Sequence, residues 1–201
     1  MIEGRVKVWD VFVRLFHWSL VLAFFVAYFT EPEGSGLAVH VWAGYFVTGL
    51  IFLRVIWGFA GTPHARFSDF AFSPAHALRY ALDLVRGRAE RHLGHSPAGA
   101  WMVYLLLVAL AATVLTGMTA LASDKHAGPL ASFFEVPQVT ATNAEPARGS
   151  EELFEEAHEL LANLAMILVT LHILGVALAS VSHRENLVGA MITGRKRSGS
   201  T

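Results

Sequence analysis

Two histidines stand fourteen positions apart in an otherwise apolar stretch, His158 and His172 in "FEEAHELLANLAMILVTLHILG". Two more, His17 in "VRLFHWSL" and His40 in "LAVHVWAGY", interrupt apolar runs nearer the N-terminus. A neutral imidazole binds metal ions through a ring nitrogen, and it also carries protons. Inside a membrane it is costly enough to require a specific partner. These four histidines are therefore the first candidates for chemistry.

The composition indicates an integral membrane protein. Of the 201 residues, 54% are hydrophobic and 15% are charged, with a mean hydropathy of +0.49. This is far from the balance of a soluble domain. The chain has no cysteine, which excludes disulfides, thiolate zinc sites, iron–sulfur clusters and covalently attached haem. Metal chemistry would have to use histidine, carboxylate or methionine.

Four segments are long enough to cross a bilayer, which takes about 20 apolar residues. They run over about 11–29, 37–59, 98–122 and 152–181. Between the second and third, "SPAHALRYALDLVRGR" carries an apolar stripe flanked by arginines and predicts a helix over about 74–88 on the membrane surface. Residues 123–150 show no sustained period, which indicates an irregular outer connection. We expect an all-α fold in one domain, residues 1–201, built as a four-helix transmembrane bundle with one added surface helix.

The distribution of charge orients these segments. By the positive-inside rule, both termini and the surface helix are expected to face the cytoplasm, because most of the basic residues lie on that side. The basic residues of that side are Arg5, Lys7, Arg14, Arg54, Arg66, Arg79, Arg86, Arg88, Arg91, Arg184, Arg195, Lys196 and Arg197, and those of the opposite side are Lys125 and Arg148. The opposite side is strongly acidic, with Glu31, Glu33, Asp124, Glu135, Glu145, Glu151, Glu152, Glu155, Glu156 and Glu159.

This orientation sorts the four histidines into pairs by depth. His17 and His172 fall in the inner half of the membrane, and His40 and His158 fall in the outer half. A helix places His158 and His172 about 21 Å apart along its axis and within about 40° around it. The fourth segment thus offers one ligand at each level, which predicts two haem groups, each bound by two neutral imidazoles.

Other residues near these sites have open interpretations. Gly44 and Gly117 would let a macrocycle approach the helix backbone closely. Arg14 and Arg54 could pair with haem propionates or serve as cytoplasmic anchors. The remaining histidines are expected on solvated surface: His64, His76, His92, His95, His126 and His183. Two other classes remain as alternatives, a proton or metal transporter that uses the same histidines and a membrane anchor without redox function.

Motifs along nearly the whole chain resemble the prokaryotic cytochrome b561 and nickel-hydrogenase cytochrome b family. They are R-x-x-H-W at Arg14 to Trp18, "WAGY" after His40, Arg54 with "WGF", "LTG", "HELLANL", "LHILG" and "SHRENLVGAMITGRKR". The resemblance implies two non-covalent b haems in a bacterial inner-membrane protein. It implies the ligand pairs His17 with His172 and His40 with His158, the same pairs that depth predicts.

The resemblance also implies a function. Family members carry electrons between the quinone pool and a redox partner such as a periplasmic c-type cytochrome, a hydrogenase or another reductase, and a branch oxidises superoxide and reduces quinone. The long, acidic outer connection favours a protein partner with a basic patch. Superoxide oxidation is the runner-up, a homodimer is an open alternative, and no nucleic-acid partner is expected.

Overall fold

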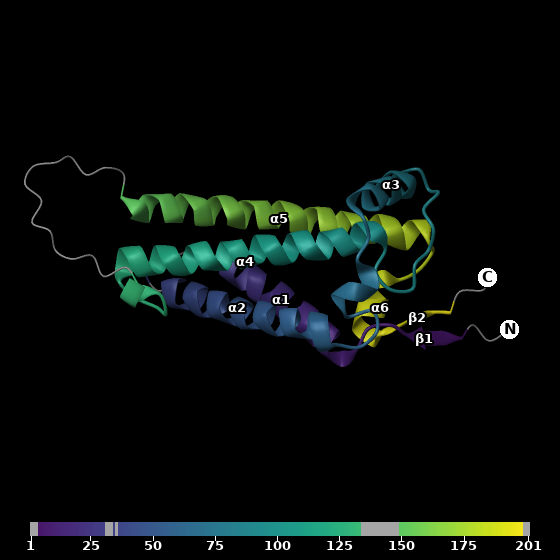
Figure 1. The fold of residues 1–201 in the computed structure, drawn as a ribbon, viewed down its shortest axis with the longest axis horizontal. Helices are drawn as coiled ribbons and strands as arrows, with labels where there is room; N and C mark the ends of the chain where they lie inside the picture. The colour runs from purple at the N-terminus through teal and green to yellow at the C-terminus, as the bar shows by residue number, and fades with distance from the viewer. Residues whose placement is uncertain (1–3, 31–33, 35, 134–148, 199–201) are drawn as a thin grey trace, which may run out of the picture. The chain divides into compact units, whose positions relative to one another are not determined.

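The computed structural model describes residues 4–30, 34, 36–133 and 149–198. Its fold is all-α, as expected, and four of its helices are long and apolar enough to cross a membrane (Figure 1). These are α1 (Val11–Phe29), α2 (Gly36–Ala60), α4 (Pro97–Lys125) and α5 (Ser150–Ser182). The chain divides into two compact units, unit 1 of Met1–Leu107 with Leu168–Thr201 and unit 2 of Val108–Ile167.

The helix ends lie close to their expected positions, with differences that have local causes. The surface helix α3 (Pro74–Val85) begins as expected, because the Ser73 hydroxyl accepts a hydrogen bond from the His76 N–H and proline occupies the first turn. It ends three residues early, since Gly87 takes a positive φ of 68°. Helix α4 runs to Lys125, so the first residues of the expected irregular connection are helical. Most of that connection, 134–148, lies outside the described residues.

In unit 1, α1 and α2 pack against each other, and Asp10 fastens the start of α1 to the end of α2. Its carboxylate caps α1 by accepting from the Val13 N–H at 2.8 Å, and it accepts from Trp57 Nε1 at 3.0 Å and Thr62 Oγ1 at 2.5 Å. Partial burial alone would raise the pKa of Asp10, but these hydrogen bonds outweigh it and hold the pKa below its ordinary value. Asp10 is therefore an ionised anchor between two spans.

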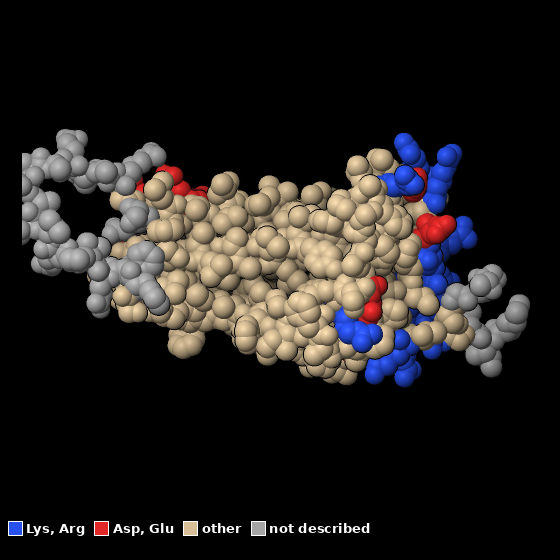
Figure 2. Space-filling model, viewed as in Figure 1, with Lys and Arg blue, Asp and Glu red and all other residues tan. Residues whose placement is uncertain are grey.

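A small polar assembly in unit 1 joins the two ends of the chain. Strand β1 (Arg5–Lys7) pairs antiparallel with β2 (Arg195–Arg197), and the short helix α6 (Leu187–Thr193) leads into β2. The Arg91 guanidinium donates to both carboxylate oxygens of Glu185, at 2.8 and 3.2 Å, which fixes the loop after α3 to the segment after α5. Figure 2 shows the basic residues of unit 1 gathered over these elements and α3. The sequence had indicated neither the sheet nor α6.

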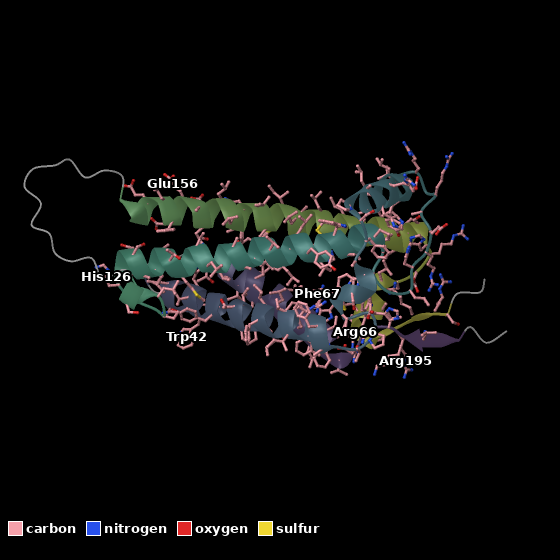
Figure 3. All side chains as sticks on the ribbon, viewed as in Figure 1. Trp42, Arg66, Phe67, His126, Glu156 and Arg195 are labelled. Carbon is pink, nitrogen blue, oxygen red and sulfur yellow. The ribbon has the colours of Figure 1, made fainter. Side chains whose placement is uncertain are left out.

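Unit 2 contains the second part of α4, the first part of α5 and the short 3₁₀ helix η2 (Ala131–Phe133). The two helix segments are in direct contact, because a Cβ added to Gly117 on α4 would lie 2.7 Å from the His158 ring on α5. The described carboxylates of unit 2 lie near the adjacent ends of these helices and include Glu156 (Figure 3). This part of the unit therefore carries negative charge.

Candidate functional site

His17 on α1 and His172 on α5 face each other in unit 1. Their ring centroids lie 6.3 Å apart, and their planes are inclined by 54°. The rings are too far apart to stack closely, yet both belong to the same local environment. His17 Nδ1 is buried and has no hydrogen-bond partner among the described residues. A buried polar atom without a partner is costly, and it normally marks a missing ligand, ion or water.

Open space adjoins His172 on the same side of its helix. Gly175 follows His172 by three positions, which places both on one face of α5. A Cβ added to Gly175 would meet no atom of the described chain within 4 Å. The helix face beside His172 is therefore open at Gly175.

His40 lies near the start of α2, and its ring orientation is fixed by the neighbouring span. Its Nδ1 lies 2.9 Å from the carbonyl oxygen of Ala27 on α1. Since a carbonyl can only accept, Nδ1 carries the proton and donates, and Nε2 carries the ring lone pair. Gly44 follows one turn later on the same face, and a Cβ there would meet nothing within 4 Å. His40 therefore combines the metal-binding tautomer with an open helix face.

His158 in unit 2 shows the same arrangement. Its Nδ1 lies 2.8 Å from the carbonyl oxygen of Thr113 on α4, so Nδ1 donates and Nε2 carries the lone pair. Gly117 packs against the ring so closely that an added Cβ would lie 2.7 Å from Cε1 and 2.8 Å from Nδ1. Metal-binding histidines commonly donate their second ring nitrogen to a carbonyl, which fixes tautomer and orientation. The sequence could not name these acceptors, because they are backbone atoms.

The two arginines of the inner level differ in their surroundings. Arg54 is only 3% exposed, its Nη2 donates to the Ala65 carbonyl at 3.1 Å, and its guanidinium lies 5.0 Å from the centroid of the Phe67 ring. Its Nη1 is buried without a hydrogen-bond partner among the described residues. Arg14 is half-buried and donates to the backbone carbonyls of Ile192 and Asp10.

His95, which was expected on solvated surface, is part of a packed cluster, and that expectation was wrong. His95 packs against Phe70 and Trp9, with ring centroids 4.2 and 4.8 Å away. Burial, with the nearby positive charges of Arg54 and Lys196, lowers the pKa of His95 to about 3. His183 shares a hydrogen bond of 3.2 Å with the Tyr80 hydroxyl. Phe70 and Trp9 lie in segments distant from His95 in the sequence, as Tyr80 does from His183. The polarity of the neighbouring sequence therefore gave no signal of these contacts.

The comparison with protein families matches residues 8–194 to the family described as prokaryotic cytochrome b561. The match covers most of the chain, including all four apolar helices and the four histidines. The chain belongs to the prokaryotic cytochrome b561 family. It is therefore a multi-pass membrane protein that transfers electrons as a b-type cytochrome, and its cofactor is b-type haem. The comparisons with curated proteins and with solved structures return no match.

The geometry of this b561-family chain fits haem iron. Two imidazoles on opposite sides of one metal ion, with metal–nitrogen bonds of about 2 Å, place their ring centroids roughly 6 Å apart. The His17–His172 separation of 6.3 Å agrees with that value. At Gly44 and Gly175, each on the same side of its helix as a histidine, an added Cβ would meet no atom of the described chain within 4 Å, so another group can approach the helix backbone there.

Proposed function

We propose that this cytochrome holds two b haems, one between His17 and His172 and the other between His40 and His158. The proposal has electrons pass between these haems, connecting the quinone pool with a redox protein in the periplasm. The facing imidazoles of His17 and His172 are the observation that carries it. Two neutral imidazoles bring no net charge into a low-dielectric interior, so they suit an iron centre inside a membrane.

Bound haem supplies a one-electron couple between ferric and ferrous iron. The chain's own residues keep the ligands in position and exclude water. The Ala27 and Thr113 carbonyls hold His40 and His158 in the tautomer that binds metal through Nε2. Such carbonyl acceptors also raise the basicity of the ligating nitrogen. A more basic ligand favours ferric iron, so these two bonds would lower the potential of the outer site.

The pairing of His40 with His158 is supported by the equal membrane depth that the sequence predicts for them and by their common hydrogen-bond pattern. Each is near the end of its span opposite the basic residues, and each donates Nδ1–H to a carbonyl of a neighbouring helix. The inner pair differs, since no carbonyl of the described residues accepts a hydrogen bond from His17 Nδ1. The reduction potentials of the two proposed haems should therefore differ.

Of the two arginines considered for haem propionates, Arg54 is the better supported. Its buried Nη1 has no hydrogen-bond partner in the part of the chain that the structure describes, and a carboxylate would supply the acceptor and neutralise a buried charge. Arg14 already donates to two carbonyls and is more exposed. We therefore assign the propionate contact to Arg54.

Charge supports the proposed orientation and partner. The pairing of β1 with β2 brings both ends of the chain together among basic residues, which by the positive-inside rule belong in the cytoplasm of a bacterial inner-membrane protein. At the adjacent ends of α4 and α5, Lys125 is paired with Asp124, and the described acids Glu152, Glu155, Glu156 and Glu159 leave this surface negative. A periplasmic partner with a basic patch would be steered to it.

The proposal is tested by a reduced-minus-oxidised visible spectrum of the purified protein, with haem quantified against protein by the pyridine method. Two low-spin b haems per chain are the expected result. One haem per chain would overturn the paired arrangement. Quinol-dependent reduction of both haems, measured in the same preparation, tests the connection to the quinone pool.

A further inference from the structure

A hollow of about 360 Å³ opens at the surface of unit 1 where α1 meets α6. It is lined by one cationic and four apolar side chains: Val11, Arg14, Leu15, Trp18 and Ile192. All four apolar side chains are exposed. Arg14 lies in the first turn of α1, at the level where a span meets the lipid headgroups, and Trp18 lies one turn deeper.

No carboxylate neutralises Arg14 within the part of the chain that the structure describes. Its Nη1 donates to the Ile192 carbonyl at 2.6 Å, and its Nε donates to the Asp10 carbonyl at 3.3 Å. The nearby Asp10 carboxylate is turned away and accepts from Val13, Trp57 and Thr62 instead. The guanidinium therefore lines the hollow with its full positive charge.

The backbone that packs on Arg14 leads directly into two further basic residues. Gly194 packs on its side chain, since a Cβ there would lie 3.2 Å from Arg14 Nε, and the next residue is Arg195 (Figure 3). Arg195 is paired across the sheet with Lys7. The described residues include no ion-pair partner for either. The hollow thus combines the positive charge of Arg14 with an apolar wall, next to a strand pair that carries further basic residues.

We propose that this hollow binds the phosphate headgroup of an anionic phospholipid, with an acyl chain lying along Leu15 and Trp18. A phosphodiester supplies the negative charge that would neutralise Arg14, and a guanidinium recognises phosphate through paired hydrogen bonds. Basic pockets between helices on the cytoplasmic side are suited to such headgroups. Bound there, the lipid contacts both α1 and α6 and fastens the C-terminal helix to the span that carries His17.

The test counts lipids bound to the purified, delipidated protein by native mass spectrometry, after addition of phosphatidylglycerol or phosphatidylcholine at equal concentration. The wild-type chain is expected to retain phosphatidylglycerol in preference to phosphatidylcholine. Arg14→Gln should lower this occupancy at least about fivefold, the factor that corresponds to ~1 kcal/mol for one cation at a membrane surface. Glutamine keeps an amide N–H for the Ile192 carbonyl.

A second variant fills the hollow and leaves Arg14 intact. Ile192→Trp keeps the backbone carbonyl that Arg14 contacts, and it should also remove the bound phosphatidylglycerol. Arg66→Gln is the matched control, because Arg66 is an exposed arginine of the same unit that pairs with Asp69 and does not line the hollow. Equal retention of the two lipids, unchanged retention in both test variants, or recovery of bound quinone in place of lipid would each overturn the proposal. Haem content is recorded in the same samples, so a failure of haem binding is seen separately.

Discussion

The imidazoles of His17 and His172 face each other across 6.3 Å, although 154 positions of sequence separate them and they belong to the first and last apolar helices. That distance suits one iron between two nitrogens, and it is too long for direct contact between the rings. The buried Nδ1 of His17 has no hydrogen-bond partner among the described residues, which points to another group at this site. In the proposed arrangement, haem bound by these two histidines would be that group.

Substitution of the histidines in pairs tests the ligand assignment. Each single change, His17→Ala, His172→Ala, His40→Ala or His158→Ala, is expected to remove one haem of two. The double variant of His17 and His172 should lose no more than either single variant, because both bind one iron. The double variant of His17 and His158 should lose both haems. The measurement is the molar ratio of haem to protein by the pyridine method.

The controls for this series come from the same chain. His126→Ala changes an exposed histidine outside the proposed ligands and should keep both haems. If the double variant of His17 and His172 lacks both haems while His17 with His158 retains one, the ligands are paired the other way.

Gly117→Ala tests the close packing behind His158. The added methyl would lie 2.7 to 2.8 Å from two ring atoms, so the ring must move away from its bond to the Thr113 carbonyl. We expect the outer haem to be lost or converted to a high-spin form, while the inner haem keeps its spectrum. Leu115→Ala, an exposed change two positions earlier on α4, is the control and should leave both spectra unchanged. An unaltered Gly117→Ala spectrum would show that the ring position does not matter for ligation.

The sequence predicted the elements that depend on local pattern. Four apolar stretches gave four helices, and the Ser73-Pro74 signal placed the start of α3, because length, hydropathy and capping act over neighbouring residues. Periodicity and charge also selected His17 and His172 as residues at one depth. Their facing rings in unit 1 agree with that selection.

What the sequence did not predict depends on long-range or backbone contacts. The strands β1 and β2 are each three residues long and lie at opposite ends of the chain, so neither has a detectable pattern alone. The acceptors for His40 and His158 are carbonyl groups, which every residue has. His95 is buried by aromatic rings from two other segments, and its polar neighbours in sequence suggested the opposite.

The low pKa of His95 predicts that the protein loses stability in mild acid. In the unfolded chain this histidine takes up a proton near its ordinary pKa of 6.5, whereas in the folded protein it stays neutral down to about pH 3. The unfolded state therefore binds more protons between these values, and the free energy of unfolding falls as the pH drops from 6.5 toward 3. The largest effect of one titrating group is about 1.4 kcal/mol per pH unit.

His95→Phe should flatten this dependence, because phenylalanine keeps the ring contacts with Phe70 and Trp9 and cannot be protonated. Thermal unfolding in detergent at pH 7, 6 and 5 measures it. His126→Phe removes an exposed histidine and should retain the wild-type slope. A slope in His95→Phe equal to that of the wild type would show that other groups cause the acid sensitivity.

The ion pair of Arg91 with Glu185 is expected to fasten the segment after α5, because the Glu185 side chain is only 5% exposed and that of Arg91 is 23% exposed. Arg91→Met removes both hydrogen bonds of the guanidinium to the buried Glu185 carboxylate and leaves it the Arg197 N–H, at 3.3 Å, and the positive charge of Lys196. Partial exposure places the loss in the free energy of unfolding at about 1–3 kcal/mol, below the range for a fully buried pair. Glu185→Gln should cost less, since its amide oxygen still accepts from Arg91.

The exposed pair of Arg66 with Asp69 gives a matched comparison for this prediction. Arg66→Met also breaks an ion pair, in which Arg66 Nε lies 3.2 Å from Asp69 Oδ2. Water replaces this lost interaction at the surface, so we expect no measurable change in the free energy of unfolding. Burial, rather than the presence of an ion pair, is then the cause of the difference between Arg91→Met and Arg66→Met. Equal losses in the two variants would contradict this. A double variant of Arg91→Met with Glu185→Met should recover part of the loss, because it removes the unpaired charge that Arg91→Met leaves behind.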